Sequence, residues 1–226
     1  MTLKQKRILW FLLWLLVIFS GPVTVFINTP PALIFSDYLI LINAFQRITG
    51  LLAFSLLFIQ IVLGSFMNKW IQILGGGAYK VHITQGLITY GFVFLHPIFE
   101  VVLRWELGGV DGLVSVFLPN YFLQREIYLT FGKIAFVLLT IAVVAAYFRT
   151  KPFFRRNWRA FHILNYLSFV LVIVHSRNVG TDVRTPPFSW FYTFTLIVFP
   201  IIVFYRFVYP FLKGRFGVGP VTKHAR

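Results

Sequence analysis

The chain has 226 residues, of which 58% are hydrophobic and only 12% are charged. A soluble domain of this size needs more polar surface to cover its core, so the composition favours a lipid bilayer as the solvent. The sequence has no cysteine, which excludes disulfides, thiolate catalysis and cysteine-ligated iron–sulfur or zinc sites. The net charge of +15 would suggest nucleic-acid binding in a soluble protein, but the basic residues lie between apolar blocks and we expect no nucleic-acid partner.

Apolar blocks of roughly 20 residues, the length that crosses a hydrocarbon core of about 30 Å, recur along the chain. We predict an all-α membrane protein, a six-transmembrane-helix bundle with spans at residues 8–28, 44–66, 81–103, 127–148, 159–178 and 187–210. The first block shows no A-x-A-like cleavage site, so it is predicted to be a span and not a signal peptide. Residues 1–226 are expected to form a single membrane domain, because no Gly-x-Gly-x-x-Gly sequence of a flavin- or nucleotide-binding domain follows a strand.

The charges between the spans predict the topology. One side of the predicted bundle collects basic residues without any acidic residue: Lys4, Lys6, Arg7, Lys69, Lys80, Arg149, Lys151, Arg155, Arg156, Arg159, Arg206, Lys213, Arg215, Lys223 and Arg226. The six acidic residues all lie toward the other side: Asp37, Glu100, Glu106, Asp111, Glu126 and Asp182. The positive-inside rule then predicts a multi-pass plasma-membrane protein with both termini in the cytoplasm, and the longest outer loop at residues 104–126.

Four of the five histidines lie in predicted spans, His82 and His96 on the third and His162 and His175 on the fifth. An ionisable residue at membrane depth is costly and usually functional. One such histidine is often only a neutral imidazole bonded to a neighbouring helix, but four of them paired on two helices are typical of a functional set. The fifth histidine, His224, lies in the basic tail and is expected to be solvated.

The spacing of the histidines predicts what they bind. At 1.5 Å per residue, His82 and His96 are separated by about 21 Å, and His162 and His175 by about 19.5 Å. The third and fifth spans both run outward, so each of two depths offers two imidazoles that face each other across a gap. This arrangement suits two haems b, one in each leaflet, with the four histidines as axial ligands of the iron.

Other metal sites fit the pattern less well. A di-metal site needs its ligands within a few ångströms, and two separate non-haem metals would need further carboxylate or thiolate ligands. The thirteen-residue separation on the fifth helix leaves its two histidines about 140° apart around an ideal helix. This helix must therefore bend or contain an irregular turn, or its two haems must be approached from different sides.

These residues resemble the ferric reductase-like transmembrane domain, the haem-bearing part of NADPH oxidases and ferric reductases, over roughly residues 8–210. The matching features are the two histidine spacings, the Asn157-Trp158-Arg159-x-x-His162-x-Leu164-x-Tyr166 stretch and Arg47-Ile48-Thr49-Gly50-Leu51.

The resemblance implies a membrane oxidoreductase that moves electrons from a cytoplasmic flavin, through an inner and then an outer haem, to a small external acceptor such as dioxygen or ferric iron. It also implies that His82 pairs with His162 and His96 with His175, and that Arg47 is a catalytic residue near the outer haem.

Members of this family usually continue into a domain that binds FAD and NAD(P)H, which this sequence lacks. We therefore expect either a truncated chain or electrons from a separate cytoplasmic flavoprotein reductase or a membrane quinol. Two further functions are open: a cytochrome b anchor that relays electrons to a protein partner, and a transporter whose histidines relay protons. A wet cavity at the outer haem near Arg47 would favour the enzyme, and an occluded haem would favour the relay.

Overall fold

A computed structural model describes the backbone of residues 1–216 and the side chains of residues 1–212. Within this part of the chain all regular elements are helical, and six segments are long and apolar enough to cross a bilayer. The predicted six-helix membrane bundle is therefore confirmed. His224 lies outside the described residues.

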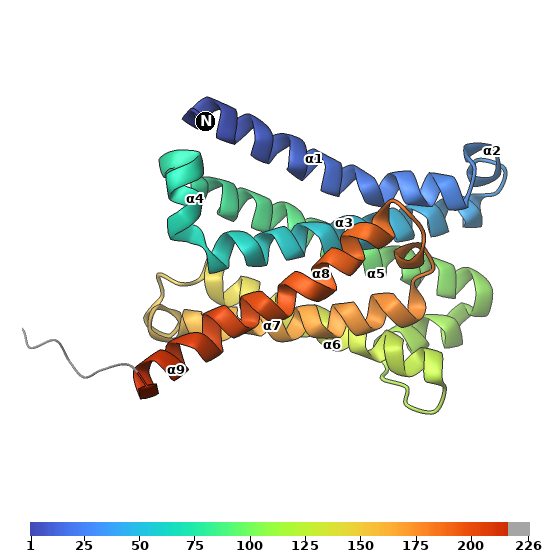
Figure 1. Cartoon of the computed structure of the whole chain (residues 1–226). Coiled ribbons are helices and arrows are strands. Elements are labelled where there is room, and N and C mark those ends of the chain that lie inside the picture. The colour runs from blue at the N-terminus through green and yellow to red at the C-terminus, as the bar shows by residue number, and fades with distance from the viewer. Residues whose placement is uncertain (217–226) are drawn as a thin grey trace, which may run out of the picture.

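Figure 1 shows the long helices running side by side through the bundle, with short helices at both of its ends. The elements are α1 (Leu3–Asn28), α2 (Pro31–Ile34), α3 (Tyr38–Ser65), α4 (Met67–Leu74), η1 (Gly75–Gly77), α5 (Ala78–Phe117), α6 (Gln124–Tyr147), α7 (Pro152–Val179), η2 (Asp182–Arg184), α8 (Phe188–Val203), η3 (Phe204–Val208) and α9 (Tyr209–Phe216).

Two helices begin earlier than predicted, because residues suited to a helix start lie before the apolar blocks. The second span begins at Tyr38 and not at residue 44, since the Asp37 carboxylate accepts hydrogen bonds from the backbone N–H groups of Leu39 and Ile40 at 2.7 and 3.1 Å. The fifth span begins at Pro152, which fits the first helical turn because its missing N–H has no helical partner there.

The prediction of a long loop at residues 104–126 is wrong for most of that segment. Helix α5 continues to Phe117 and is interrupted at Gly109, whose φ of 56° and ψ of −135° leave the helical region. A positive φ is readily adopted by glycine, so the chain changes direction here without the strain of a side chain. The connection between α5 and α6 is consequently short.

The helices that carry the histidines belong to two layers. Helix α3 packs along α5, and α6 packs along α7, whereas contacts between the α3/α5 layer and the α6/α7 layer are sparse. Helix α3 has the largest buried fraction of the six spans. Helix α8 closes one side through an aromatic cluster in which the buried Phe169 of α7 contacts Phe54 and Phe58 of α3 and Phe199 of α8.

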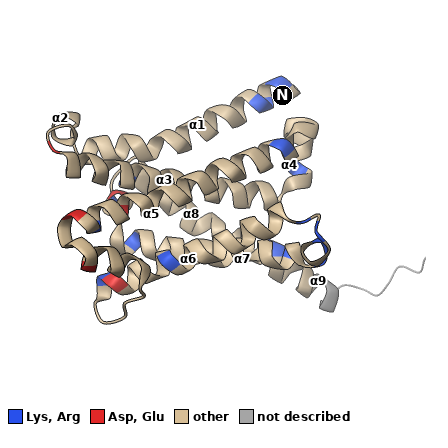
Figure 2. Cartoon of the chain, turned by 180° about the vertical axis from the view of Figure 1, so that it is seen from behind, with Lys and Arg blue, Asp and Glu red and all other residues tan. Residues whose placement is uncertain are grey.

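The two ends of the bundle differ in charge, as Figure 2 shows. One end carries the N-terminus, α4 and α9, and the described charged residues there are all basic; we call it the basic end. The opposite end carries α2 and η2 together with all six acidic residues, and we call it the acidic end. This separation lets each functional residue be assigned to one depth of the bundle.

Candidate functional site

The four histidines of α5 and α7 form two facing pairs. His82 of α5 lies against His162 of α7 toward the basic end, and their ring centres are 6.3 Å apart. His96 and His175 lie toward the acidic end, with ring centres 6.4 Å apart. The ring planes are inclined by 72° in the first pair and 79° in the second. Each pair therefore bridges the two layers at one depth.

The two histidines of α7 leave the helix on different sides. Residues 152–179 are α-helical throughout, so no irregular turn absorbs the angle of about 140° that the thirteen-residue spacing creates. His162 lies near Trp158 of its own helix, with ring centres 5.9 Å apart, whereas His175 reaches the backbone of α6. Helix α7 thus contains no irregular turn, and its two histidines point in different directions from the helix axis.

Both histidines of the acidic-end pair are oriented by hydrogen bonds to backbone carbonyls. Nδ1 of His96 lies 2.9 Å from the carbonyl oxygen of Gln46, and Nδ1 of His175 lies 2.9 Å from that of Tyr128. A carbonyl oxygen only accepts, so each Nδ1 must carry the proton and donate it. In a neutral imidazole the second nitrogen, Nε2, then has a free lone pair. Each ring is consequently in the tautomer that binds a metal through Nε2.

Two glycines make room for these rings. A Cβ atom on Gly50 of α3 would lie 2.8 Å from Cε1 and 2.9 Å from Nδ1 of His96. A Cβ atom on Gly132 of α6 would lie 2.8 Å from Nδ1 and 3.0 Å from Cε1 of His175. The shortest of these distances, 2.8 Å at each glycine, is below any normal van der Waals contact, so a larger residue at either position would require the ring to shift. Neither glycine was predicted as a site residue.

The basic-end pair lacks this support within the described residues. Nδ1 of His82 is buried without a hydrogen-bond partner, and Nδ1 of His162 has only a 3.4 Å contact with the amide nitrogen of Asn165. The nearest glycine is Gly64 of α3, where a Cβ atom would lie 3.3 Å from Cε1 of His82. The two pairs therefore share the facing arrangement and differ in what holds their rings.

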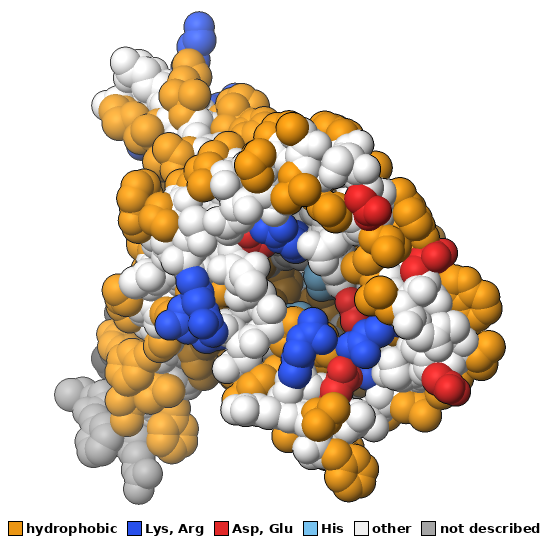
Figure 3. Space-filling model, turned by 90° about the vertical axis from the view of Figure 1, so that its right-hand side faces the viewer, with side chains coloured by type: hydrophobic (Ala, Val, Ile, Leu, Met, Phe, Trp, Pro, Cys, Tyr) orange, Lys and Arg blue, Asp and Glu red, His pale blue; other side chains and the backbone are white. Residues whose placement is uncertain are grey.

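A cavity of about 400 Å³ with both polar and apolar lining lies at the acidic end, beside the turn that follows His96. Figure 3 views this end and shows a hollow with histidine side chains at its floor and charged side chains around it. The cavity is lined by Asn43, Gln46, Glu100, Leu103, Arg104, Leu107, Gly108, Gly112 and Arg125. The cavity opens at the surface near the acidic-end histidines.

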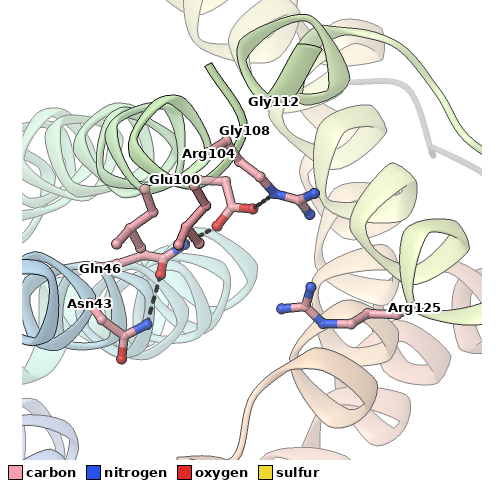
Figure 4. A pocket seen from close by; sticks show the side chains of 9 residues that line it. Asn43, Gln46, Glu100, Arg104, Gly108, Gly112 and Arg125 are labelled. Atoms are coloured by element: carbon pink, nitrogen blue, oxygen red, sulfur yellow. Dashed lines mark hydrogen bonds and ion pairs between the residues drawn. The ribbon is translucent and has the colours of Figure 1, made fainter. Parts of the chain in front are cut away.

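The charged groups of this cavity are arranged asymmetrically. On one wall, the Glu100 carboxylate accepts hydrogen bonds from the Gln46 amide and from Arg104 Nε, and Arg104 also donates to Glu126. From the opposite wall, the guanidinium of Arg125 points into the cavity, as Figure 4 shows. Among the described residues Arg125 makes no hydrogen bond or ion pair, so its charge is free to meet an anion.

Arg47, the predicted catalytic residue, is held in a partly buried ion pair. Its Nε donates to Oδ2 of Asp182 at 2.7 Å, its NH2 group donates to Oδ1 of the same carboxylate, and its NH1 group donates to Thr29 Oγ1 at 2.7 Å. Asn28 donates to Asp182 as well, and the aspartate is only 2% exposed. Arg47 adjoins Gln46 in the sequence but does not line the cavity.

The comparisons with known proteins identify one family. The family described as a ferric reductase like transmembrane component matches residues 49–173, which is more than half of the chain. The matched residues include His82, His96 and His162 and end just before His175. No curated protein and no solved structure matches the chain.

Proposed function

This chain belongs to the ferric reductase-like transmembrane family, and from that premise we propose that it holds two b-type haems and conducts electrons across a membrane to an external acceptor. The observation that carries the proposal is the facing of two histidine pairs, His82 with His162 and His96 with His175, at two depths between the two helix layers. We further propose a plasma-membrane location with the basic end in the cytoplasm, which the charge separation supports.

The donor set fits a haem at each level. A metal–imidazole nitrogen bond is about 2 Å long and the bonded nitrogen lies about 1 Å from the ring centre, so two imidazoles on opposite sides of one metal have ring centres about 6 Å apart. The observed separations of 6.3 and 6.4 Å agree with this value. Within the described residues no group of three or more histidine, cysteine or carboxylate side chains could hold a bare metal ion. A macrocycle that supplies four nitrogens needs only two histidines.

Different residues of the chain would bind the haems, orient the ligands and exclude water. His82 and His162 would hold one haem, and His96 and His175 the other. When bound, each haem supplies an iron that changes between the ferric and ferrous states and so carries one electron. The hydrogen bonds to Gln46 and Tyr128 present the free Nε2 lone pairs of the acidic-end rings, and the buried aromatic side chains around Phe169 exclude water between the two depths. The donor is proposed to be a flavin with NAD(P)H, on a further domain or a separate cytoplasmic flavoprotein.

The cavity at the acidic end supports an enzyme more than a relay to a protein partner. An electron-transfer anchor needs no small-molecule cavity beside its terminal haem, whereas a reductase of dioxygen or ferric iron does. The cavity adjoins the helix turn of His96 and contains the free charge of Arg125. Arg47 is proposed to act next to it, with its guanidinium oriented by Asp182.

A reduced-minus-oxidised absorption spectrum of the purified chain, with haem quantified against protein, tests the proposed function. We expect the spectrum of low-spin, bis-histidine haem b and a ratio of about two haems per chain, because each pair provides two axial ligands. A colourless protein after haem-replete expression would refute the proposal and leave a histidine-based transporter as the better interpretation. A ratio near one would show that one pair does not bind haem.

Arg125→Gln is expected to slow the reoxidation of the dithionite-reduced protein by an anionic ferric chelate such as ferric citrate. A hydrogen bond to a charged group contributes about 1.5–3 kcal/mol, which corresponds to a loss of roughly tenfold to a hundredfold in rate. The rate is measured by stopped-flow absorption, with the haem content expected to stay unchanged. Arg184→Gln is the matched control, since Arg184 lies at the same end outside the cavity lining. Equal slowing in both variants would contradict a specific role for Arg125.

A further inference from the structure

The two acidic-end histidines use the same structural device on two unrelated helices. His96 leaves α5 and lies over Gly50 of α3, and it donates to the carbonyl of Gln46, four residues before that glycine. His175 leaves α7 and lies over Gly132 of α6, and it donates to the carbonyl of Tyr128, again four residues before the glycine. In a helix the carbonyl four residues back accepts the N–H of the glycine itself. Each glycine therefore exposes a carbonyl that a side chain would otherwise cover, and we call each of these places a glycine notch.

The notches require glycine for a steric reason. A Cβ atom at either position would lie within 2.8 Å of the imidazole ring, and the ring cannot retreat without lengthening its bond to the carbonyl. Both glycines lie in helix interiors, where alanine is intrinsically more favourable by about 1 kcal/mol. Helix stability thus gives no reason for glycine at either position, whereas the approach of the rings does.

The basic-end pair has no equivalent. His82 lies near Gly64 at a looser 3.3 Å, and among the described residues its Nδ1 has no partner. His162 has only the 3.4 Å contact with Asn165 on its own helix. Within the part of the chain that the structure describes, the two levels therefore differ in one chemical respect: only the acidic-end imidazoles donate Nδ1–H to strong acceptors.

We propose that Gly50 and Gly132 are positioning residues that give the acidic-end haem a lower reduction potential than the basic-end haem. The inference rests on the proposed function. Donation from Nδ1–H raises the basicity of the ligating imidazole, and a more basic axial ligand stabilises the ferric over the ferrous state. A free carboxylate near this haem would also stabilise the ferric state, but the Glu100 carboxylate is paired with Arg104, so the hydrogen-bonded imidazoles carry the argument. The haem beside the cavity is then the stronger reductant of the two, which suits a site that gives electrons to an acceptor.

Optical redox titration of the haem-loaded full chain in nanodiscs tests the inference. In the unmodified protein we expect two separate midpoint potentials. In Gly50→Ala and in Gly132→Ala the lower midpoint should rise while the higher one stays, and the low-spin electron paramagnetic resonance signal of one haem should shift. Gly91→Ala is the matched control, because Gly91 lies inside α5 with nothing within 4 Å of its Cβ position. Movement of the higher midpoint, or retention of both haems with no shift, would overturn the inference.

A second measurement applies if an alanine variant loses its haem. His82→Ala should retain only the acidic-end haem and His96→Ala only the basic-end haem, so each midpoint can be measured alone. We expect the haem that remains in His82→Ala to have the lower potential. If the unmodified protein binds two haems but the haem in His82→Ala has the higher potential, this inference is refuted and the proposed function is not. If the unmodified protein binds no haem, the proposed function is refuted.

Discussion

His96→Ala is expected to lower the haem content of the purified chain from about two to about one per molecule, and His175→Ala should do the same. The two rings face each other at one depth of the bundle, with ring centres 6.4 Å apart. Removal of either ring would therefore leave that haem with a single histidine ligand. His82→Ala and His162→Ala should remove the other haem, because their rings meet at the basic end. Haem content is measured by the pyridine haemochrome assay against protein concentration.

The pairing is tested by combining these variants. His96→Ala with His175→Ala should lose no more haem than either change alone, because both changes affect one site. His96→Ala with His82→Ala should lose both haems and give a colourless protein. If the first combination removed both haems, or if no single change reduced the haem content, the assigned pairs would be wrong.

Much of this site could be predicted from the sequence because it depends on regular helical geometry. A constant rise per residue converts the spacings of His82–His96 and His162–His175 into two matched depths, and apolar blocks of the right length give the spans. The direction of the His175 ring could not be predicted, since it depends on how closely α7 packs against α6. Periodicity within one helix does not contain that information.

The two glycines of α3 that face the histidines of α5 leave a signal in the sequence. Gly50 and Gly64 of α3 are separated by the same number of residues as His82 and His96 of α5. A glycine of one helix facing each histidine of an antiparallel neighbour produces this equal spacing, and Gly50 meets His96 while Gly64 meets His82. A repeated distance between unlike residues on two helices is thus informative when the helices pack side by side.

The partner of Arg47 was beyond prediction for a different reason. Asp182 is 135 residues away in the sequence and lies in the short η2 helix that follows α7. The ion pair forms because α3 and η2 lie next to each other in the folded chain, and no local sequence pattern indicates that they do. The family resemblance pointed to Arg47 as a functional residue, and the structure supplies the carboxylate that holds it.

Asp182→Ala is expected to destabilise the protein by about 3–5 kcal/mol, since it leaves the partly buried guanidinium of Arg47 without its countercharge. The carboxylate is 3% exposed and also accepts from Asn28, so its loss disconnects the end of α1, the first turns of α3 and the segment after α7. The apparent melting temperature in detergent should fall by roughly 10 °C. Asp111→Ala is the control, because Asp111 is exposed at the same end and its removal should change stability by at most about 0.5 kcal/mol.

A double variant separates the structural role of this ion pair from the proposed catalytic role of Arg47. Replacement of both partners by apolar residues of similar volume, Arg47→Met with Asp182→Leu, removes the unpaired charge and should recover much of the stability lost in Asp182→Ala. If Arg47 acts on the acceptor, this stable variant should keep both haems and still be reoxidised slowly by dioxygen and by ferric citrate. If the double variant is reoxidised as fast as the unmodified protein, Arg47 serves only to join the three segments at the acidic end, and the cavity around Arg125 must act without it. The test also requires that the double variant recovers stability. If it stays as unstable as Asp182→Ala, Arg47 must make stabilising contacts other than those with Asp182 and Thr29.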